Sequence, residues 1–527
     1  MINSAANLGK YLLRRRQAVF LAALVALYVF ILMNGLLIYR DYGISWDEPD
    51  QVQVGIQNYR YIFQGDPALF TYTIQYNGPF FELILYTLTG QPDSSILYQR
   101  RHLITFLAAY LGLLAFGALI LYLFRKSWLA FCGVLFLYLS PRLFADFFYN
   151  SKDIPFMTLI VLGCLTQVWF LDSPTIWKAG LHGLVCAAAI ATRIPGLFMP
   201  LLTLFFLEFA MLLDKKDEQY RRKRYVLPGF VLVLVCVGLT ILFYPILWKQ
   251  PLQSFLDTIH FMGHYPYQGS NFYLGQFYPA QATPWHYIPV WIAITTPLLY
   301  LLLMCLGSGV ILTRLVNQYR ARDLGGLRNN LLMVSWVLLP WLAIVLLHSV
   351  VYNGWRHLYF IYPGLLLFSL MGLDFLAGLK TLLPNIKKFI LTAVVVIGLV
   401  GPAVFMIQNH PYQNLFFNRL AGPNMTAIMQ RFDMDYWGLA YRKGLEFILA
   451  NDPRQHILFT AETMPGWYNL AILPPDQRQR LEHTPDIQQA DYYIANYAAH
   501  PPNYPYPNEV FSVKVMGAKI LSVFKLK

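Results

Sequence analysis

The chain has 527 residues, of which 57% are hydrophobic and only 13% are charged, and its mean hydropathy is +0.45. Soluble proteins average about 25% charged residues, so this composition excludes an ordinary soluble domain and indicates a polytopic membrane protein. The formal net charge of +13 does not indicate nucleic-acid binding, because Lys and Arg gather in short segments between apolar runs.

The first apolar run, residues 17–39, follows the basic stretch Arg14-Arg15-Arg16. It is long enough to span a bilayer and has no small-residue cleavage site, so we predict a retained helix with a cytoplasmic N-terminus. Directly after it comes Trp46-Asp47-Glu48-Pro49. Adjacent carboxylates at a membrane surface suit a general base, and the alternative is a solvated loop. Pro49 is expected to keep this backbone out of helical geometry.

The remaining apolar runs predict about eleven crossings in total. Large outer loops are expected at 40–101, with a short surface helix near Phe80, and at 248–288. Predicted cytoplasmic segments hold about twice as many Lys and Arg as the outer loops, in agreement with this orientation. The predicted spans are 102–124, 127–141, 154–171, two shortened helices or a re-entrant pair within 179–213, 225–247, 290–313, 329–351, 358–377 and 389–408.

The fold class expected from this pattern is an all-α membrane domain, residues 1–408, followed by a small extracytoplasmic α/β domain, residues 409–527. In the second domain, residues 438–450 have helical spacing. Strands are predicted at 456–460, 492–496, 509–515 and 519–524, with Met516-Gly517 as a hairpin turn between the last two.

The cysteines and histidines give no clear metal motif. All five cysteines lie inside apolar runs, which supports neither a disulfide framework nor a Cys-based zinc site. His260, His264 and His286 share the second large loop, but their spacing matches no compact ligand motif. No cofactor is assigned, and whether a divalent metal takes part stays open.

Ionisable side chains fall at the same predicted face of the membrane. Charged groups at membrane depth cost about 2.5–3.5 kcal/mol each, so those next to the spans are expected to face a shared polar cavity. Acids suit proton abstraction, and Arg, Lys and His suit a phosphate. The alternatives are that Lys152 only reaches lipid headgroups and that Arg193 pairs with a helix carbonyl. The set comprises Asp47, Glu48, Asp146, Lys152, Asp153, Arg193, Arg356 and His357.

Two acidic segments carry a resemblance to a known family. Ser45-Trp46-Asp47-Glu48-Pro49 and Asn150-Ser151-Lys152-Asp153-Ile154-Pro155 resemble the acidic motifs of bacterial GT-C-type polyprenyl-phosphate-dependent glycosyltransferases, a group that includes protein O-mannosyltransferases and aminoarabinose transferases of lipid A. Further similar segments occur in the same order along nearly the whole chain: 191–193, 284–289, 355–359, 410–418 and 435–438.

The resemblance implies transfer of a sugar from a polyprenyl-phosphate donor to an acceptor hydroxyl on the outer face, with inversion. Asp47 would be the catalytic base, Glu48 would orient the site or share the proton, and Asp153 would organise the donor or acceptor side. The donor phosphate would be bound by Lys152, Arg193, Arg356 and His357. The sugar pocket would be lined by Trp46, Asn150, His264, Tyr265, Trp285 and Tyr352.

The resemblance also implies a bacterial inner membrane location and a lipid, glycan or protein acceptor, with no nucleic-acid partner. A polysaccharide polymerase or ligase that uses lipid-linked glycan is a rival, as is a subunit that only binds the lipid-linked sugar. A secondary transporter would also have many spans. The long first outer loop, the lack of an inverted repeat and the folded C-terminal domain argue against a transporter.

Overall fold

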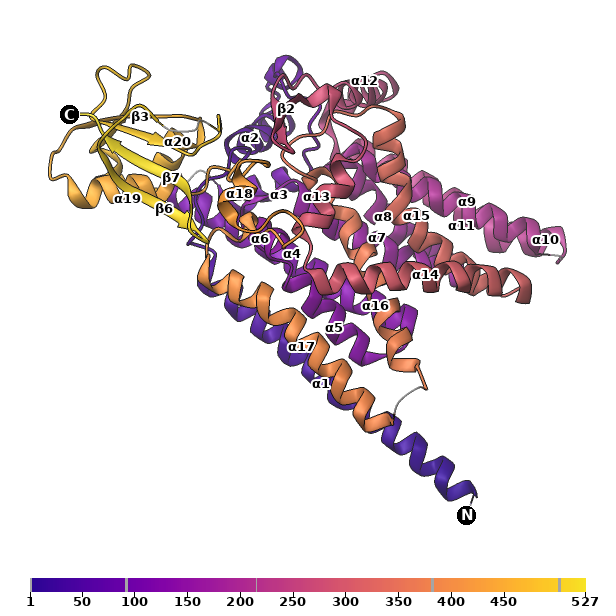
Figure 1. Ribbon diagram of the computed structural model, residues 1–527. Helices are drawn as coiled ribbons and strands as arrows, with labels where there is room; N and C mark the ends of the chain where they lie inside the picture. The colour runs from indigo at the N-terminus through magenta and orange to yellow at the C-terminus, as the bar shows by residue number, and fades with distance from the viewer. Residues whose placement is uncertain (1, 91–92, 215, 381–382, 501–503) are drawn as a thin grey trace.

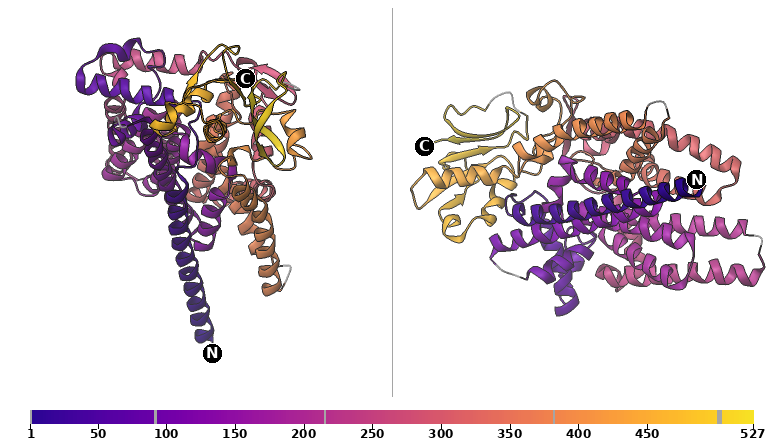
Figure 2. Two further views of the ribbon diagram at one scale, coloured as in Figure 1. Left: turned by 90° about the vertical axis from the view of Figure 1, so that its left-hand side faces the viewer. Right: turned by 90° about the horizontal axis from the view of Figure 1, so that it is seen from below.

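The computed structural model describes residues 2–90, 93–214, 216–380, 383–500 and 504–527 (Figure 1). It is mostly helical, and a small sheet lies near the C-terminus. Figures 1 and 2 place this sheet at the end of the helix bundle opposite the N-terminus.

Nine helical segments in the described ranges are long and apolar enough to cross a membrane, which identifies a multi-pass membrane protein. A tenth is counted if α5 (Ser127–Tyr138) and α6 (Pro141–Tyr149), bent by 71°, form one span. The apolar helix α8 (Ile176–Thr192) is shorter. The nine are Arg15–Ile38 in α1 (Ile2–Ile38), α4 (Ser94–Phe124), α7 (Asp153–Asp172), Ile194–Leu213 with α9 (Phe198–Leu213), Glu218–Phe243 with α10 (Glu218–Arg221) and α11 (Leu227–Phe243), α14 (Leu298–Ala321), α15 (Leu324–Leu346), Arg356–Gly378 with η6 (Arg356–Ile361) and α16 (Tyr362–Gly378), and α17 (Pro384–Gln408).

Two of these segments form the centre of the bundle. In their most apolar windows, 78% of the residues of α7 and of Arg356–Gly378 are buried, against 22% for α1 and α17. Glycines allow close packing around this centre: a Cβ on Gly307 of α14 would overlap the backbone of α16 at Phe368. Asp153 and Arg356 are the first residues of the two central segments, so both are held by the best-packed part of the molecule.

Short helices cover one end of the bundle where the sequence predicts mainly loop. Residues 40–101 contain α2 (Glu48–Gln64), η1 (Pro67–Thr71), α3 (Phe80–Thr89) and the start of α4. The expectation that Pro49 keeps this backbone non-helical is wrong, because Pro49 lies in the first turn of α2. The first turn leaves its N–H groups unpaired in any case, so a proline costs no hydrogen bond there.

The second large loop is also structured. It contains α12 (Pro251–Gly263) and an antiparallel hairpin of β1 (Ser270–Tyr273) and β2 (Gln276–Pro279). The span predicted at 290–313 is divided into α13 (Tyr287–Thr295) and α14, which begins directly after Pro297. A proline favours an extended conformation in the preceding residue, and Thr296 adopts it.

The C-terminal domain has a five-stranded sheet of β3 (Ile457–Ala461), β4 (Leu481–His483), β5 (Tyr492–Ala495), β6 (Glu509–Val515) and β7 (Ala518–Lys525), in the order β4-β3-β5-β7-β6. β3 pairs in parallel with β4 and β5, and β7 pairs antiparallel with β5 and β6. The predicted hairpin turn is confirmed: Met516 and Gly517 both have positive φ, as a tight two-residue turn requires. The three-residue strand β4 was not predicted. The helices of the domain are α18 (Met425–Met429), α19 (Tyr441–Asn451), α20 (Pro465–Tyr468), η8 (Asn469–Ile472) and α21 (Pro475–Arg478).

Candidate functional site

Four helix ends bring their charged side chains together. Arg356 Nη1 lies 2.5 Å from Asp47 Oδ2 and 3.8 Å from Asp153 Oδ2, and Arg193 forms an ion pair with Asp153. Asp47 is the N-cap of α2, Asp153 begins α7, Arg193 follows α8 and Arg356 begins η6. We call Asp47, Lys152, Asp153, Arg193 and Arg356 the ion cluster. The sequence predicts that these groups share a polar site, and the structure places them together.

The turn before α7 is held by its own asparagine. Asn150 Nδ2 donates to Asp153 Oδ2 at 3.0 Å and to Asp146 Oδ1 at 2.9 Å, and Asn150 Oδ1 accepts from Asp153 N at 2.9 Å. Lys152 Nζ donates to Oδ1 of the buried Asn77 at 3.2 Å. Asn150 therefore orients an acidic residue of the cluster. The hydrogen bond from Lys152 to Asn77 was not predicted.

Burial and neighbouring charges shift two of the cations. Burial, together with the positive charges of Arg193 and Arg356, lowers the pKa of Lys152 to about 7. Burial and Arg356 lower the pKa of Arg193 to about 10. The ion cluster contains three basic and two acidic side chains. With a pKa of about 7, Lys152 gains or loses its charge near neutral pH. A surplus of cations of this kind suits a bound anion.

Aromatic rings surround Arg356. Its guanidinium carbon lies 5.1 Å from the ring centroid of Tyr352 and 4.7 Å from that of Trp437. Tyr352 stacks on Tyr267 at 3.9 Å between centroids and meets the edge of His357 at 4.7 Å. These contacts place Tyr352 and His357 beside the cluster, as predicted. Neither Trp437 nor Tyr267 was predicted as a site residue. The local signal for Tyr267 is its position in the aromatic part of the 248–288 loop, two residues after the predicted Tyr265.

Tyr265 interacts electrostatically with the same cluster. Burial and the negative charges of Asp47 and Asp50 raise its pKa, whereas Arg356 and Arg193 lower it. Burial, followed by Asp47, also raises the pKa of Asp50, and Lys152 opposes the rise. Tyr265 is therefore close enough to the ion cluster for its charges to act on the phenol, while its described ring contact is with Phe261, at 5.6 Å between centroids.

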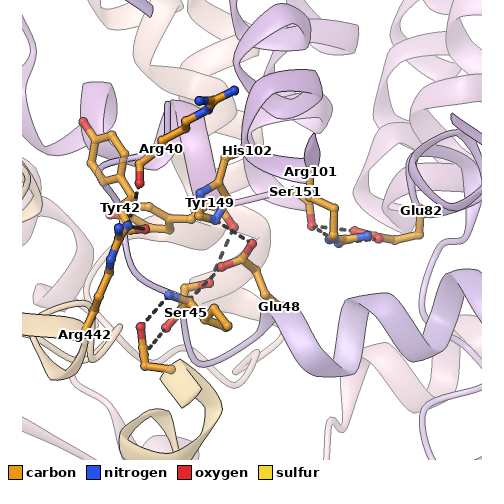
Figure 3. Close-up of polar contacts among 12 residues, drawn as sticks. Arg40, Tyr42, Ser45, Glu48, Glu82, Arg101, His102, Tyr149, Ser151 and Arg442 are labelled. Carbon is orange, nitrogen blue, oxygen red and sulfur yellow. Dashed lines mark hydrogen bonds and ion pairs between the residues drawn. The ribbon is translucent and has the colours of Figure 1, made fainter. Parts of the chain in front are cut away.

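The Glu48 side chain contacts Ser45 and His102 (Figure 3). One carboxylate oxygen accepts from Ser45 N at 2.8 Å and the other lies 3.0 Å from His102 Nε2, and Glu48 is only 2% exposed. No contact described for Glu48 joins it to Asp47. This geometry fits the predicted orienting role and gives no support to a proton shared between the two carboxylates.

A second buried ion pair supports the turn before α7 (Figure 3). Arg101 Nη2 lies 2.7 Å from Glu82 Oε2 and donates to Ser151 Oγ at 3.2 Å, and Ser151 Oγ donates to Glu82 Oε1 at 2.5 Å. Glu82 is on α3 and Arg101 is on α4. This pair fixes Ser151, the residue between Asn150 and Lys152.

Two predicted pocket residues, His264 and Trp285, lie at the surface instead. His264, which directly follows α12, is exposed, and its Nδ1 lies 3.1 Å from His260 O in that helix. Trp285 is 65% exposed and meets His286 edge-on. Neither has a described contact with the ion cluster, because each ends or follows an element at the surface. Trp46 is half-buried, and its main-chain N donates to Trp437 O at 3.0 Å.

Among the described residues, no group of three or more His, Cys, Asp or Glu side chains is arranged to hold a metal ion. Comparisons with known proteins give no assignment either: no family model matches the chain, and no curated protein matches it significantly. The function is therefore argued from the geometry of the ion cluster.

Proposed function

We propose that the protein is a GT-C-type membrane glycosyltransferase that moves a sugar from a polyprenyl-phosphate donor to an acceptor hydroxyl, with inversion at the anomeric carbon. The observation that carries the proposal is the 2.5 Å contact between Asp47 and Arg356, within a cluster that also contains Lys152, Arg193 and Asp153. A base beside several phosphate-binding cations is the set of groups that this reaction needs.

Asp47 is the base in this scheme. Its carboxylate takes the proton of the acceptor hydroxyl, and the oxygen attacks the anomeric carbon from the face opposite the phosphate. The bond between that carbon and the phosphate oxygen breaks, and its electron pair leaves with the polyprenyl phosphate. Asp47 is partly exposed, with 29% of its side chain accessible, so an acceptor is able to reach it.

The three cations stabilise the leaving group. Negative charge grows on the phosphate as the bond breaks, and preorganised cations in a poorly hydrated site stabilise such charge strongly. Arg356 has two carboxylate neighbours in the free protein, and a bound phosphate would compete with Asp47 for its guanidinium. Donor binding would thereby free the Asp47 carboxylate for the acceptor proton. His357 and the Tyr352 ring border the same region.

The proposed setting is a bacterial inner membrane, with the N-terminus in the cytoplasm, about eleven crossings and the C-terminal domain outside. The nine membrane-length helices in the described ranges, the bent pair α5–α6 and the short helix α8 support this number. The ion cluster lies at helix ends, where a lipid headgroup would meet the protein.

The test uses full-length protein in nanodiscs with radiolabelled polyprenyl-phosphate sugars and a lipid extract of the cell envelope as acceptor. Transfer of label with loss of polyprenyl-phosphate sugar is expected. Binding without turnover would indicate an accessory subunit, turnover only with lipid-linked oligosaccharides would indicate a polymerase or ligase, and sugar flux into proteoliposomes would indicate a transporter. Mass spectrometry of envelope glycans with and without the protein then identifies the acceptor.

A further inference from the structure

The C-terminal domain contacts the non-helical segment 42–46, which leads directly into Asp47. The side chain of Asn469, at the start of η8, accepts a hydrogen bond from Ile44 N at 2.9 Å and donates one to Ile44 O at 2.9 Å. A carboxamide that pairs with both main-chain groups of one residue does what a neighbouring strand would do. The backbone of Ile44 is therefore fixed by a residue 425 positions later in the chain.

Other contacts of the same domain act on the same segment. Arg442 Nη1, on α19, donates to Tyr42 O at 2.9 Å and to Arg40 O at 2.5 Å, as Figure 3 shows. Gly43 lies so close that a Cβ there would be 2.6 Å from Asn469 Oδ1 and 2.7 Å from the carbonyl of Leu439. Residues 40, 42 and 44 are therefore each hydrogen-bonded to the C-terminal domain, and there is no room for a larger residue at Gly43.

We infer that Asn469 is a positioning residue, which sets the carboxylate of Asp47 against Arg356 by fixing the main chain of Ile44. The catalytic part of this inference rests on the proposed function, since it is there that Asp47 is the base. The same domain also supplies Trp437, whose ring lies 4.7 Å from the Arg356 guanidinium and whose carbonyl accepts from Trp46 N. The C-terminal domain therefore contacts both the segment that precedes Asp47 and the guanidinium of Arg356.

Asn469 could also act only within the C-terminal domain, and the experiment has to distinguish that role from the positioning of Ile44. Asn469 Nδ2 also donates to Pro465 O at 2.8 Å within its own domain, so its removal is able to weaken that domain alone. Two variants act on the contact from opposite sides: Asn469→Ala removes both bonds to Ile44, and Gly43→Ala pushes the segment away without changing the C-terminal domain. Asn451→Ala is the matched control, because Asn451 is exposed and its side chain bonds only to Phe447 O among its described contacts.

The first readout is amide hydrogen exchange of the full chain in nanodiscs, which needs no activity. Exchange of Ile44 and Trp46 amides is expected to be about tenfold faster or more in Asn469→Ala and Gly43→Ala than in the wild type and Asn451→Ala. Amides of β5 and β7 should be unchanged in Gly43→Ala. Unchanged protection of Ile44 in both variants would overturn the inference.

The second readout is kinetic. Both variants should lower kcat about 10- to 100-fold and leave the KM of the donor within about twofold, because the base is misplaced while Lys152 and Arg193 stay in position. A wild-type kcat in a variant whose Ile44 amide exchanges freely would overturn the inference. Absence of turnover in the wild type would overturn the proposed function instead, and the exchange data would still decide whether Asn469 fixes the segment.

Discussion

Arg356 and Asp47 are 309 positions apart in the chain, and their side chains meet at 2.5 Å. Asp47 occupies the N-cap position of α2 without a side-chain hydrogen bond to the helix, and 29% of its side chain is exposed, whereas Arg356 begins a segment that is buried at the centre of the bundle. Removal of the carboxylate charge should therefore affect chemistry more than folding.

Asp47→Asn is expected to reduce transfer at least about 100-fold, because an amide cannot accept the acceptor proton. The measurement is kcat with saturating donor, together with the amount of folded protein in the membrane. Asp257→Asn is the control, since Asp257 pairs with Gln253 on α12. Near-normal turnover of Asp47→Asn would remove Asp47 as the base.

Arg356→Ala is expected to raise the KM of the donor about tenfold or more, because a charge-assisted contact to phosphate is lost. Donor binding by the purified variant is measured against wild type and Arg419→Ala, a variant of an exposed arginine. If all three proteins bind the donor equally well, Arg356 has no part in phosphate binding.

Lys152 should make donor binding depend on pH. Its pKa is lowered to about 7, so it is mostly protonated below this pH and loses its charge as the pH rises through it. The donor phosphate is a diester and keeps its charge over the same range. The KM of the donor should therefore rise above pH 7, by up to about tenfold per pH unit.

The variant Lys152→Arg checks this assignment, because arginine stays protonated throughout. Its KM should be flat between pH 6 and about pH 9. An identical rise of KM in the wild type and in Lys152→Arg would assign the titration to another group.

The buried pair of Glu82 and Arg101 should matter for stability. Both side chains are 2% exposed, so Glu82→Ala leaves a buried guanidinium without its carboxylate and should cost about 3–5 kcal/mol. The control Glu509→Ala removes a half-exposed pair with Lys519 and should cost about 1 kcal/mol or less. The apparent Tm in detergent measures both, and an equal decrease in the two variants would contradict the prediction.

The proposed orientation puts the C-terminal domain outside the cytoplasm. A reporter enzyme that works only in an oxidising compartment, fused after Lys527, should be active, and a reporter that works only in the cytoplasm should be inactive at the same site. The physical basis is the excess of Lys and Arg in the predicted cytoplasmic segments. The reverse pair of results would invert the orientation.

Local patterns in the sequence determine the helical membrane domain and most strands of the C-terminal sheet. Apolar runs of spanning length predict the membrane-length helices, and alternating residues around Met516-Gly517 predict the last hairpin. Charges at the ends of apolar runs also indicate the meeting of Asp47, Asp153, Arg193 and Arg356, because buried charge at membrane depth needs partners.

Only the tertiary structure decides which neighbours those charges have. The pairing of Glu48 with His102, the indole of Trp437 beside Arg356 and the bonds of Asn469 to Ile44 join segments far apart in the chain. None has a periodic or local signal, since an asparagine in a polar domain looks the same whether it binds water or a distant backbone. The exposure of Trp285 is likewise a result of packing, which composition does not specify.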